Sequence, residues 1–242
     1  MPPVKQKAGA ETAISGPKEL DFATVLAASV HDMKNSLFLL LQSIEQVAAE
    51  VESPQPRSRL ADIHYETQRL NTGLMQLLSL YRENHNQLPV NKDEQFLDEL
   101  ADDLVANNQF YARHHGVELN VNILDDSSWF FDRNLILVLL SDVVINALRY
   151  AEKNVQINLG IDQLNNELVI EVFDDGKGYP QIMLDSYQAG PADMVLSSGR
   201  TGLGLYFSHL IAQAHRNKGR QGSIALSNDS PLGGSRFTLR LP

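Results

Sequence analysis

One stretch of the chain repeats apolar residues at gaps of three and four from residue 22 to residue 51. The members of this heptad stripe are Phe22, Leu26, Val30, Met33, Leu37, Leu40, Ile44, Val47 and Val51. Such spacing places the side chains along one face of a long helix. The helix is expected to end at the proline-containing segment 53–56, because proline cannot continue the hydrogen-bonded ladder.

A second stripe follows the prolines and fades before Pro89. Its members are Leu60, Ile63, Thr67, Leu70, Leu74, Leu77 and Tyr81. Two long helices joined by a short loop form an antiparallel hairpin. Two helices alone bury little apolar surface, so we expect the hairpin to pair with a second copy into a four-helix bundle, as a homodimer.

The remainder of the chain mixes helical and strand patterns. Helices are expected over 94–115, 132–151 and 202–214, and strands over 117–123, 155–159, 167–173, 223–227 and 236–241. Phe96 should face the core, as should Trp129, Phe130 and Phe131, and Gly116 is a candidate C-cap. This order predicts an α/β sandwich, with helices packed on one mixed sheet.

The fold class is therefore α+β, in which a two-helix hairpin precedes the sandwich. The expected domains are a flexible tail over 1–18, the hairpin over 19–87 and the sandwich over 88–242. Residues 217–221 look like an insertion before the penultimate strand.

Charge and composition exclude several classes of function. The net charge of −10 argues against nucleic-acid binding, which requires a basic face. The absence of cysteine excludes disulfides, thiolate metal sites and a cysteine nucleophile. No apolar run reaches the roughly 20 residues of a membrane span, and no signal-peptide pattern is present, so a cytoplasmic location is expected.

The first helix carries a candidate nucleophile at His31. Its neighbour Val30 and the nearby Met33 belong to the stripe, which leaves His31 on an exposed flank. A neutral imidazole is nucleophilic near pH 7. Asp32 is suited to orient the ring and accept a proton, and Asn35 shares its face at i+4. By themselves these residues equally describe a solvated surface histidine.

Three polar segments mark the sandwich. Asp142, Asn146 and Arg149 share one helix face, as a magnesium–phosphate cluster requires. Segment 174–178 (Asp-Asp-Gly-Lys-Gly) follows a strand. Its glycines let the backbone approach a flat ligand closely, and a carboxylate at the strand end can accept a hydrogen bond from an exocyclic amine. Segment 198–205 is glycine-rich and opens a helix, as phosphate sites do. Each segment alone has a plainer explanation: a polar helix edge, an ordinary turn, or a common Gly-x-Gly.

In this order and spacing, the segments resemble those of the sensor histidine kinases of two-component systems. Residues 31–37 resemble the phosphoacceptor box of that family, 142–150 its asparagine box, and 174–178 and 199–205 its two glycine boxes. The closing Gly-Gly-Ser-Arg-Phe-Thr-Leu-Arg-Leu-Pro also resembles the last strand of the family. The resemblance covers the chain from about residue 20 to residue 242.

The resemblance implies that the sandwich binds ATP and Mg²⁺. Asp174 would hold the adenine amine, Asn146 would ligate Mg²⁺, and Asp142 would lie near the metal. The residues it assigns to the nucleotide are Asp142, Asn146, Arg149, Tyr150, Asp174, Gly176, Gly178, Thr201, Gly202, Leu203 and Gly204.

The implied activity is ATP-dependent autophosphorylation of His31, followed by transfer to an aspartate of a response-regulator receiver domain. His31, Asp32 and Asn35 would be catalytic, with Asn35 supporting dephosphorylation of the regulator. Input would come from a separate sensory partner if the chain is full-length, or from a sensor outside this sequence if the chain is a fragment. One alternative is a phosphotransfer protein of the same fold that does not use ATP, against which the glycine boxes count. Another is a serine/threonine kinase or ATPase with the hairpin as a scaffold, against which segment 31–35 counts.

Overall fold

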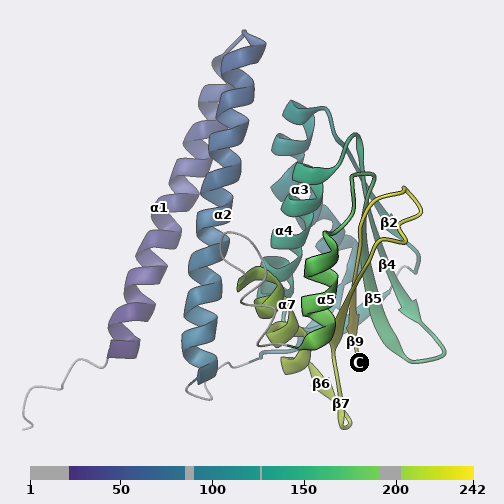
Figure 1. Ribbon diagram of the computed structural model, residues 1–242. Helices are drawn as coiled ribbons and strands as arrows, with labels where there is room; N and C mark the ends of the chain where they lie inside the picture. Colours follow the sequence, from purple (N-terminus) through teal and green to yellow (C-terminus); the bar gives the residue numbers. More distant parts are fainter. Residues whose placement is uncertain (1–21, 85–89, 126, 191–202) are drawn as a thin grey trace, which may run out of the picture.

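The computed structural model describes residues 22–84, 90–125, 127–190 and 203–242. Two long helices, α1 (Phe22–Glu50) and α2 (Pro54–Asn84), lie side by side as the expected hairpin (Figure 1). The predicted tail over 1–18 lies outside the described residues. In the described part of the chain, no helix is long and apolar enough to cross a membrane.

The connection between α1 and α2 is shorter than the sequence suggested. Pro54 and Pro56 were expected in the loop, but α2 begins at Pro54. Proline is tolerated in a first helical turn because the N–H groups there have no partner within the helix. Arg57 reaches back and donates two hydrogen bonds to the carbonyl of Val51, from Nε at 3.0 Å and Nη2 at 2.5 Å. This contact satisfies a carbonyl left open at the end of α1.

The heptad stripe of α1 divides between two faces of the helix. Val30 and Ile44 are buried within the hairpin, together with Ala48. Met33 and Val47 remain about half exposed. Among the stripe residues whose burial the structure describes, Val30 and Ile44 pack inside the hairpin, whereas Met33, Leu40 and Val47 form an exposed seam.

The second part of the chain is an α/β sandwich, which confirms the predicted fold class (Figure 1). Its central sheet has the order β2-β4-β5-β9-β8, and only the β2–β4 pair is parallel. The strands of this sheet are β2 (Glu118–Ile123), β4 (Asn154–Asp162), β5 (Glu167–Asp174), β8 (Ser223–Ser227) and β9 (Arg236–Leu241). The helices are α3 (Leu97–His115), α4 (Arg133–Tyr150), α5 (Gln181–Ala189) and α7 (Leu203–Ala214).

The core lies between the sheet and helices α3, α4 and α7. Alternate residues of β5, namely Leu168, Ile170 and Val172, point into it and are fully buried. Leu140 and Leu148 of α4 meet them from the helical layer. The expected C-cap Gly116 ends α3 in the left-handed region, at φ 69°.

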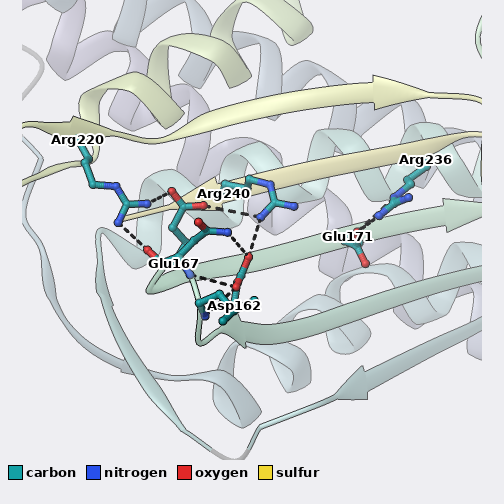
Figure 2. Close-up of polar contacts among 8 residues, drawn as sticks. Asp162, Glu167, Glu171, Arg220, Arg236 and Arg240 are labelled. Carbon is teal, nitrogen blue, oxygen red and sulfur yellow. Dashed lines mark hydrogen bonds and ion pairs between the residues drawn. The ribbon is translucent and has the colours of Figure 1, made fainter.

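The opposite face of the sheet carries paired charges (Figure 2). Arg236 Nη2 lies 2.5 Å from Glu171 Oε1, and Arg220 pairs with Glu167. Arg240 Nη1 lies 3.6 Å from an oxygen of Asp162 and 3.7 Å from one of Glu167. Exposed pairs contribute about 1 kcal/mol or less each, so their main effect is to keep this face polar and hydrated.

Two short ribbons correct the sequence-based assignment. Residues 93–96 form strand β1 (Asp93–Phe96), which pairs with β3 (Ser128–Phe131), whereas a helix was predicted from Glu94. Phe96 and Phe130 were expected in the core but are 53% and 63% exposed, because both lie on the outer face of this ribbon. Phe131 faces the other way and is buried, as expected.

The predicted insertion folds as a second ribbon, β6 (Arg216–Asn217) with β7 (Arg220–Gln221). Lys218 and Gly219 form its turn, both with positive φ.

Asp132 offers a test of how α4 is positioned. Its carboxylate caps α4 by accepting from the Leu135 N–H at 3.1 Å, and it also accepts from the Asn91 N–H at 2.9 Å. We expect Asp132→Ala to lower the free energy of unfolding by about 2 kcal/mol, because two backbone donors lose their partner. Urea denaturation measures the change, and the exposed Asp102→Ala on α3 is the matched control. Equal midpoints for both variants would contradict this account.

Candidate functional site

The C-terminal end of β5 holds a buried carboxylate. Asp174 is 3% exposed, and its Oδ1 accepts from the Gly176 N–H at 2.8 Å and the Ser235 N–H at 3.1 Å. The Ser235 hydroxyl donates to the other oxygen, Oδ2. A carboxylate has about four acceptor positions, so three donors fix its orientation and leave capacity for one more. This carboxylate is therefore suited to bind an exocyclic amine.

The first glycine box is closely packed against neighbouring backbone and side chains. A Cβ at Gly176 would collide with the Tyr150 carbonyl oxygen at the end of α4. Gly178 has φ +77°, and a Cβ there would lie 2.7 Å from Oδ1 of Asn228. Asn228 holds the backbone of Tyr179, accepting from its N–H at 2.7 Å and donating to its carbonyl at 3.0 Å. Both glycines are thus required by the protein's own packing, in addition to any ligand.

Two residues beside Asp174 were not predicted as site residues. Ser235 lies at the start of β9, next to the paired residues Phe173 and Arg236, and its carbonyl accepts from the Asp174 N–H at 3.1 Å. Desolvation raises the pKa of Tyr179 to about 12, partly offset by a hydrogen bond with Ser235. A pairing between segments more than fifty residues apart leaves no local pattern, and only the resemblance of the last strand pointed to this region.

Asp175 ties the glycine box to the end of α4. Its Oδ1 accepts from the backbone N–H groups of Glu152 at 2.8 Å and Lys153 at 3.0 Å, and its Oδ2 from the Asn154 side chain at 2.9 Å. Burial opposes ionisation of Asp175, but these donors outweigh it and lower the pKa to about 2. The asparagine-box helix and the first glycine box are therefore held in fixed relation.

The asparagine box occupies α4, as predicted. The exposed Asn146 uses its Nδ2 to donate to the Asp142 carbonyl at 2.7 Å, so its amide oxygen is the atom suited to a metal ion. Arg149 lies one turn further, where Nη1 donates to the Tyr65 hydroxyl of α2 at 3.1 Å. Its guanidinium also lies 5.6 Å from the centre of the Tyr150 ring. A contact between Arg149 and the hairpin was not predicted.

A bound Mg²⁺ would fit this site only with ligands beyond the protein. In the described ranges, no group of three or more His, Asp or Glu side chains is placed to hold a metal. Mg²⁺ commonly keeps several waters and takes its remaining ligands from one or two side chains and substrate phosphates. Asn146 beside a nucleotide meets that requirement.

The second glycine box is only partly described. Thr201 and Gly202 lie outside the described residues, as does the side chain of Leu203. α7 begins at Leu203, which places Gly204 in its first turn, where backbone N–H groups have no partner within the helix. The Gly204 carbonyl accepts from the Ser208 hydroxyl at 3.0 Å.

His31 lies on α1 with a 70% exposed side chain, in agreement with the predicted exposed flank. Its Nδ1 lies 3.5 Å from Asp32 Oδ1 and 3.4 Å from Asn35 Nδ2. When Nδ1 carries the proton, it faces the Asp32 carboxylate and Nε2 is left as the unprotonated nucleophile. The hairpin meets the sandwich through α2, with α1 on the far side (Figure 1). The structure therefore does not bring His31 and Asp174 together.

Comparisons with known proteins agree on the kind of domain present. Residues 131–242 match the family described as histidine kinase-, DNA gyrase B-, and HSP90-like ATPase. Sensor protein SrrB of Staphylococcus aureus is 26% identical over 219 residues, which cover 88% of this chain and 36% of SrrB. The chain thus spans about a third of the length of such curated relatives.

Solved structures show the same fold. The histidine kinase AdeS of Acinetobacter baumannii superposes with a TM-score of 0.57 at 18% identity, over 86% of this chain and 95% of AdeS. The catalytic domain of the histidine kinase ThkA, in a nucleotide-free form, superposes with a TM-score of 0.52 at 20% identity. That match covers 63% of this chain and 97% of the ThkA domain.

The lowered pKa of Asp175 predicts how stability depends on pH. The folded-state pKa of about 2 lies below the ordinary value of about 3.9, so the stabilisation is present above pH 4 and is lost as pH falls toward 2. We expect Asp175→Asn to be less stable than the wild type at pH 7, with a gap that narrows as the pH falls from about 4 toward 2. Chemical denaturation across this range measures the gap, with Asp102→Asn as control. A gap that is constant with pH would rule out the carboxylate as its source.

Proposed function

We propose that this relative of the sensor histidine kinases transfers the γ-phosphoryl group of ATP to His31. Its residues 131–242 carry a domain of the histidine kinase-, DNA gyrase B-, and HSP90-like ATPase family. The kinship predicted from the sequence is confirmed by these comparisons. In our proposal, residues 19–87 form the phosphotransfer and dimerisation domain, and residues 88–242 form the ATP-binding domain.

The observation that carries the proposal is the buried, oriented carboxylate of Asp174. Burying a charged carboxylate is costly unless donors compensate, and the donors here come from Gly176 and Ser235. The result is an acceptor that is fixed in place before any ligand arrives. An adenine amine supplies the one donor that the carboxylate still has room for.

The phosphate end of ATP is assigned to the asparagine box and the second glycine box. Asn146 would supply an amide oxygen to Mg²⁺, Asp142 would lie near the metal, and Arg149 would contact phosphate. Thr201, Gly202 and Gly204 would line the phosphates and Leu203 would pack under that loop. Tyr150 would flank the nucleoside, and Gly176 and Gly178 would give the adenine ring room. Bound Mg²⁺ would neutralise charge that develops on the phosphates.

The chemistry at His31 is a phosphoryl transfer. Nε2 forms a bond to the γ-phosphorus while the bond to the β–γ bridging oxygen breaks, and ADP leaves. Asp32 keeps the proton on Nδ1 and stabilises the positive charge that the ring acquires. The phosphoryl group then passes to an aspartate of a response-regulator receiver domain. Asn35 supports later dephosphorylation of the regulator by orienting a water molecule toward the aspartyl phosphate.

A homodimer follows from the apolar seam on the hairpin surface. Met33, Leu40 and Val47 of α1 recur every seven residues and are 46–51% exposed. Ile63 and Leu70 of α2 continue the seam and are 50% and 60% exposed. A seam with heptad spacing on two adjacent helices fits a second copy of the hairpin in a four-helix bundle. Input from a separate sensory partner remains a prediction.

The first test is the position of the phosphoryl group. The dimeric protein incubated with Mg²⁺ and γ-labelled ATP should acquire acid-labile, base-stable label, and His31→Ala should acquire none. Lys34→Ala, an exposed change one turn away, should be labelled normally. Label that enters only from a phosphorylated receiver domain would favour the phosphotransfer alternative. Acid-stable label on another protein would favour a kinase that acts on serine or threonine.

The second test is nucleotide affinity. Asp174→Asn replaces one acceptor oxygen with a donor, so we expect ATP binding to weaken at least about tenfold, and Ser235→Ala about 3- to 10-fold. Equilibrium binding of a fluorescent ATP analogue with Mg²⁺ measures both. Asp102→Asn on α3 controls for the change in net charge. Unaltered affinity in Asp174→Asn would place the adenine elsewhere.

A further inference from the structure

The hairpin meets the sandwich through a stripe of polar and aromatic residues on α2. Helix α2 is the helix of the hairpin that lies against the sandwich (Figure 1). Asp62, Tyr65 and Gln68 recur on it at three-residue spacing, and each contacts a residue of α3 or α4. Asp62 Oδ1 lies 3.2 Å from His115 Nε2, and Gln68 Nε2 donates to the Asn107 carbonyl at 2.7 Å. Both partners belong to α3.

Tyr65 lies at the centre of this stripe and is 4% exposed. Its ring centre lies 5.0 Å from that of Tyr111 on α3, and its hydroxyl accepts from Arg149 Nη1 on α4 at 3.1 Å. The Arg149 guanidinium also lies over the Tyr65 ring, 5.5 Å from its centre. Arg149 thus makes both a hydrogen bond and a cation–π contact with the hairpin.

Arg149 is also the residue that the proposed function assigns to phosphate. Guanidinium groups bind phosphate best through a fork of two parallel N–H groups, and one Arg149 terminal nitrogen already serves Tyr65. A phosphate that binds the edge of the guanidinium containing this N–H competes with the Tyr65 hydroxyl for it. The guanidinium has five N–H groups in all, so the expected effect is a partial weakening of nucleotide binding and not its exclusion.

We propose that Tyr65 and the phosphates of ATP compete for Arg149, so that docking of the hairpin on the ATP-binding domain restrains the nucleotide site. This inference rests on the proposed function, because it takes Arg149 as a phosphate ligand. Linkage makes the effect reciprocal: docking weakens nucleotide binding, and nucleotide weakens docking by the same factor. The docked arrangement leaves His31 on the far helix, so release of this contact also frees the ATP-binding domain to approach His31.

The contact is suited to reversible docking. Its partners are paired through hydrogen bonds, ring contacts and the Asp62–His115 pair, and each of these groups can exchange its partner for water when the surfaces separate. Burial raises the pKa of Tyr111 to about 12, so this phenol stays neutral beside Tyr65 and Arg149. Docking therefore does not depend on ionisation of Tyr111 near neutral pH.

The decisive variant is Tyr65→Phe, which removes the hydroxyl and keeps the ring. We expect the 242-residue chain with this change to bind a fluorescent ATP analogue about 2- to 10-fold more tightly, because Arg149 is no longer held by a hydrogen bond. Tyr111→Phe is the matched control, since it removes a hydroxyl from the same interface but leaves the Tyr65 hydroxyl that accepts from Arg149. Unchanged or weaker nucleotide binding in Tyr65→Phe would overturn the proposal.

A double-mutant cycle separates competition from a structural effect. Arg149→Ala should weaken nucleotide binding, and in that background Tyr65→Phe should have no further effect. An equal effect of Tyr65→Phe with and without Arg149 would contradict the competition.

A cross-link gives an independent readout, because the chain contains no native cysteine. Gln68→Cys with Asn107→Cys, joined by a short bis-maleimide, should hold the docked state and weaken nucleotide binding at least about threefold. The same variant capped with a monofunctional maleimide should bind nucleotide at least as tightly as the wild type, because it loses the Gln68–Asn107 docking contact without being held in the docked state. A cross-link that does not form, or that leaves affinity unchanged, would count against the proposal.

These experiments distinguish the two levels of inference. If the wild type binds no nucleotide, or Asp174→Asn leaves its affinity unaltered, the proposed function fails and the competition fails with it. If Asp174→Asn and Arg149→Ala weaken binding as expected while Tyr65→Phe does not tighten it, only the competition fails.

Discussion

The buried carboxylate of Asp174 is the constraint on which the proposed nucleotide site of the sandwich depends. A charge at that depth is tolerated because the Gly176 N–H and the Ser235 N–H and hydroxyl surround it. The Gly176 donor is local, but the two Ser235 donors reach Asp174 only when β5 and β9 pair in the observed register. The sheet therefore assembles the site as it forms, and the site in turn requires glycine at position 176, where the Tyr150 carbonyl leaves no room for a side chain.

Helix α4 links this site to the hairpin. The segment that follows its last turn is held to the glycine box through Asp175, which accepts from Glu152, Lys153 and Asn154. The last turn itself presents Arg149 to Tyr65 of α2. A change at the nucleotide site is thus one helical turn away from the surface on which the hairpin rests, and no long chain of intermediate contacts is needed to connect the two.

The hairpin shows what a periodic apolar pattern can predict about a helix and what it leaves undecided. A stripe with gaps of three and four predicted α1 correctly, but it could not say which apolar residues pack within one chain. Val30 and Ile44 face α2, whereas Met33 and Val47 form a seam for which we propose a second copy. Both sets obey the same spacing, and only the position of α2 separates them.

Periodicity and the family motifs determined, from sequence alone, the hairpin, the strands of the central sheet and the segments that carry Asn146 and Asp174, because these signals are local. The tertiary structure decided what depends on distant partners: the outward orientation of Phe96 and Phe130, the pairing of Ser235 with Asp174, and the contact of Arg149 with Tyr65. Each of these joins segments more than thirty residues apart. A local pattern records which face of an element is apolar, but the neighbour that covers that face is fixed only when the chain has folded.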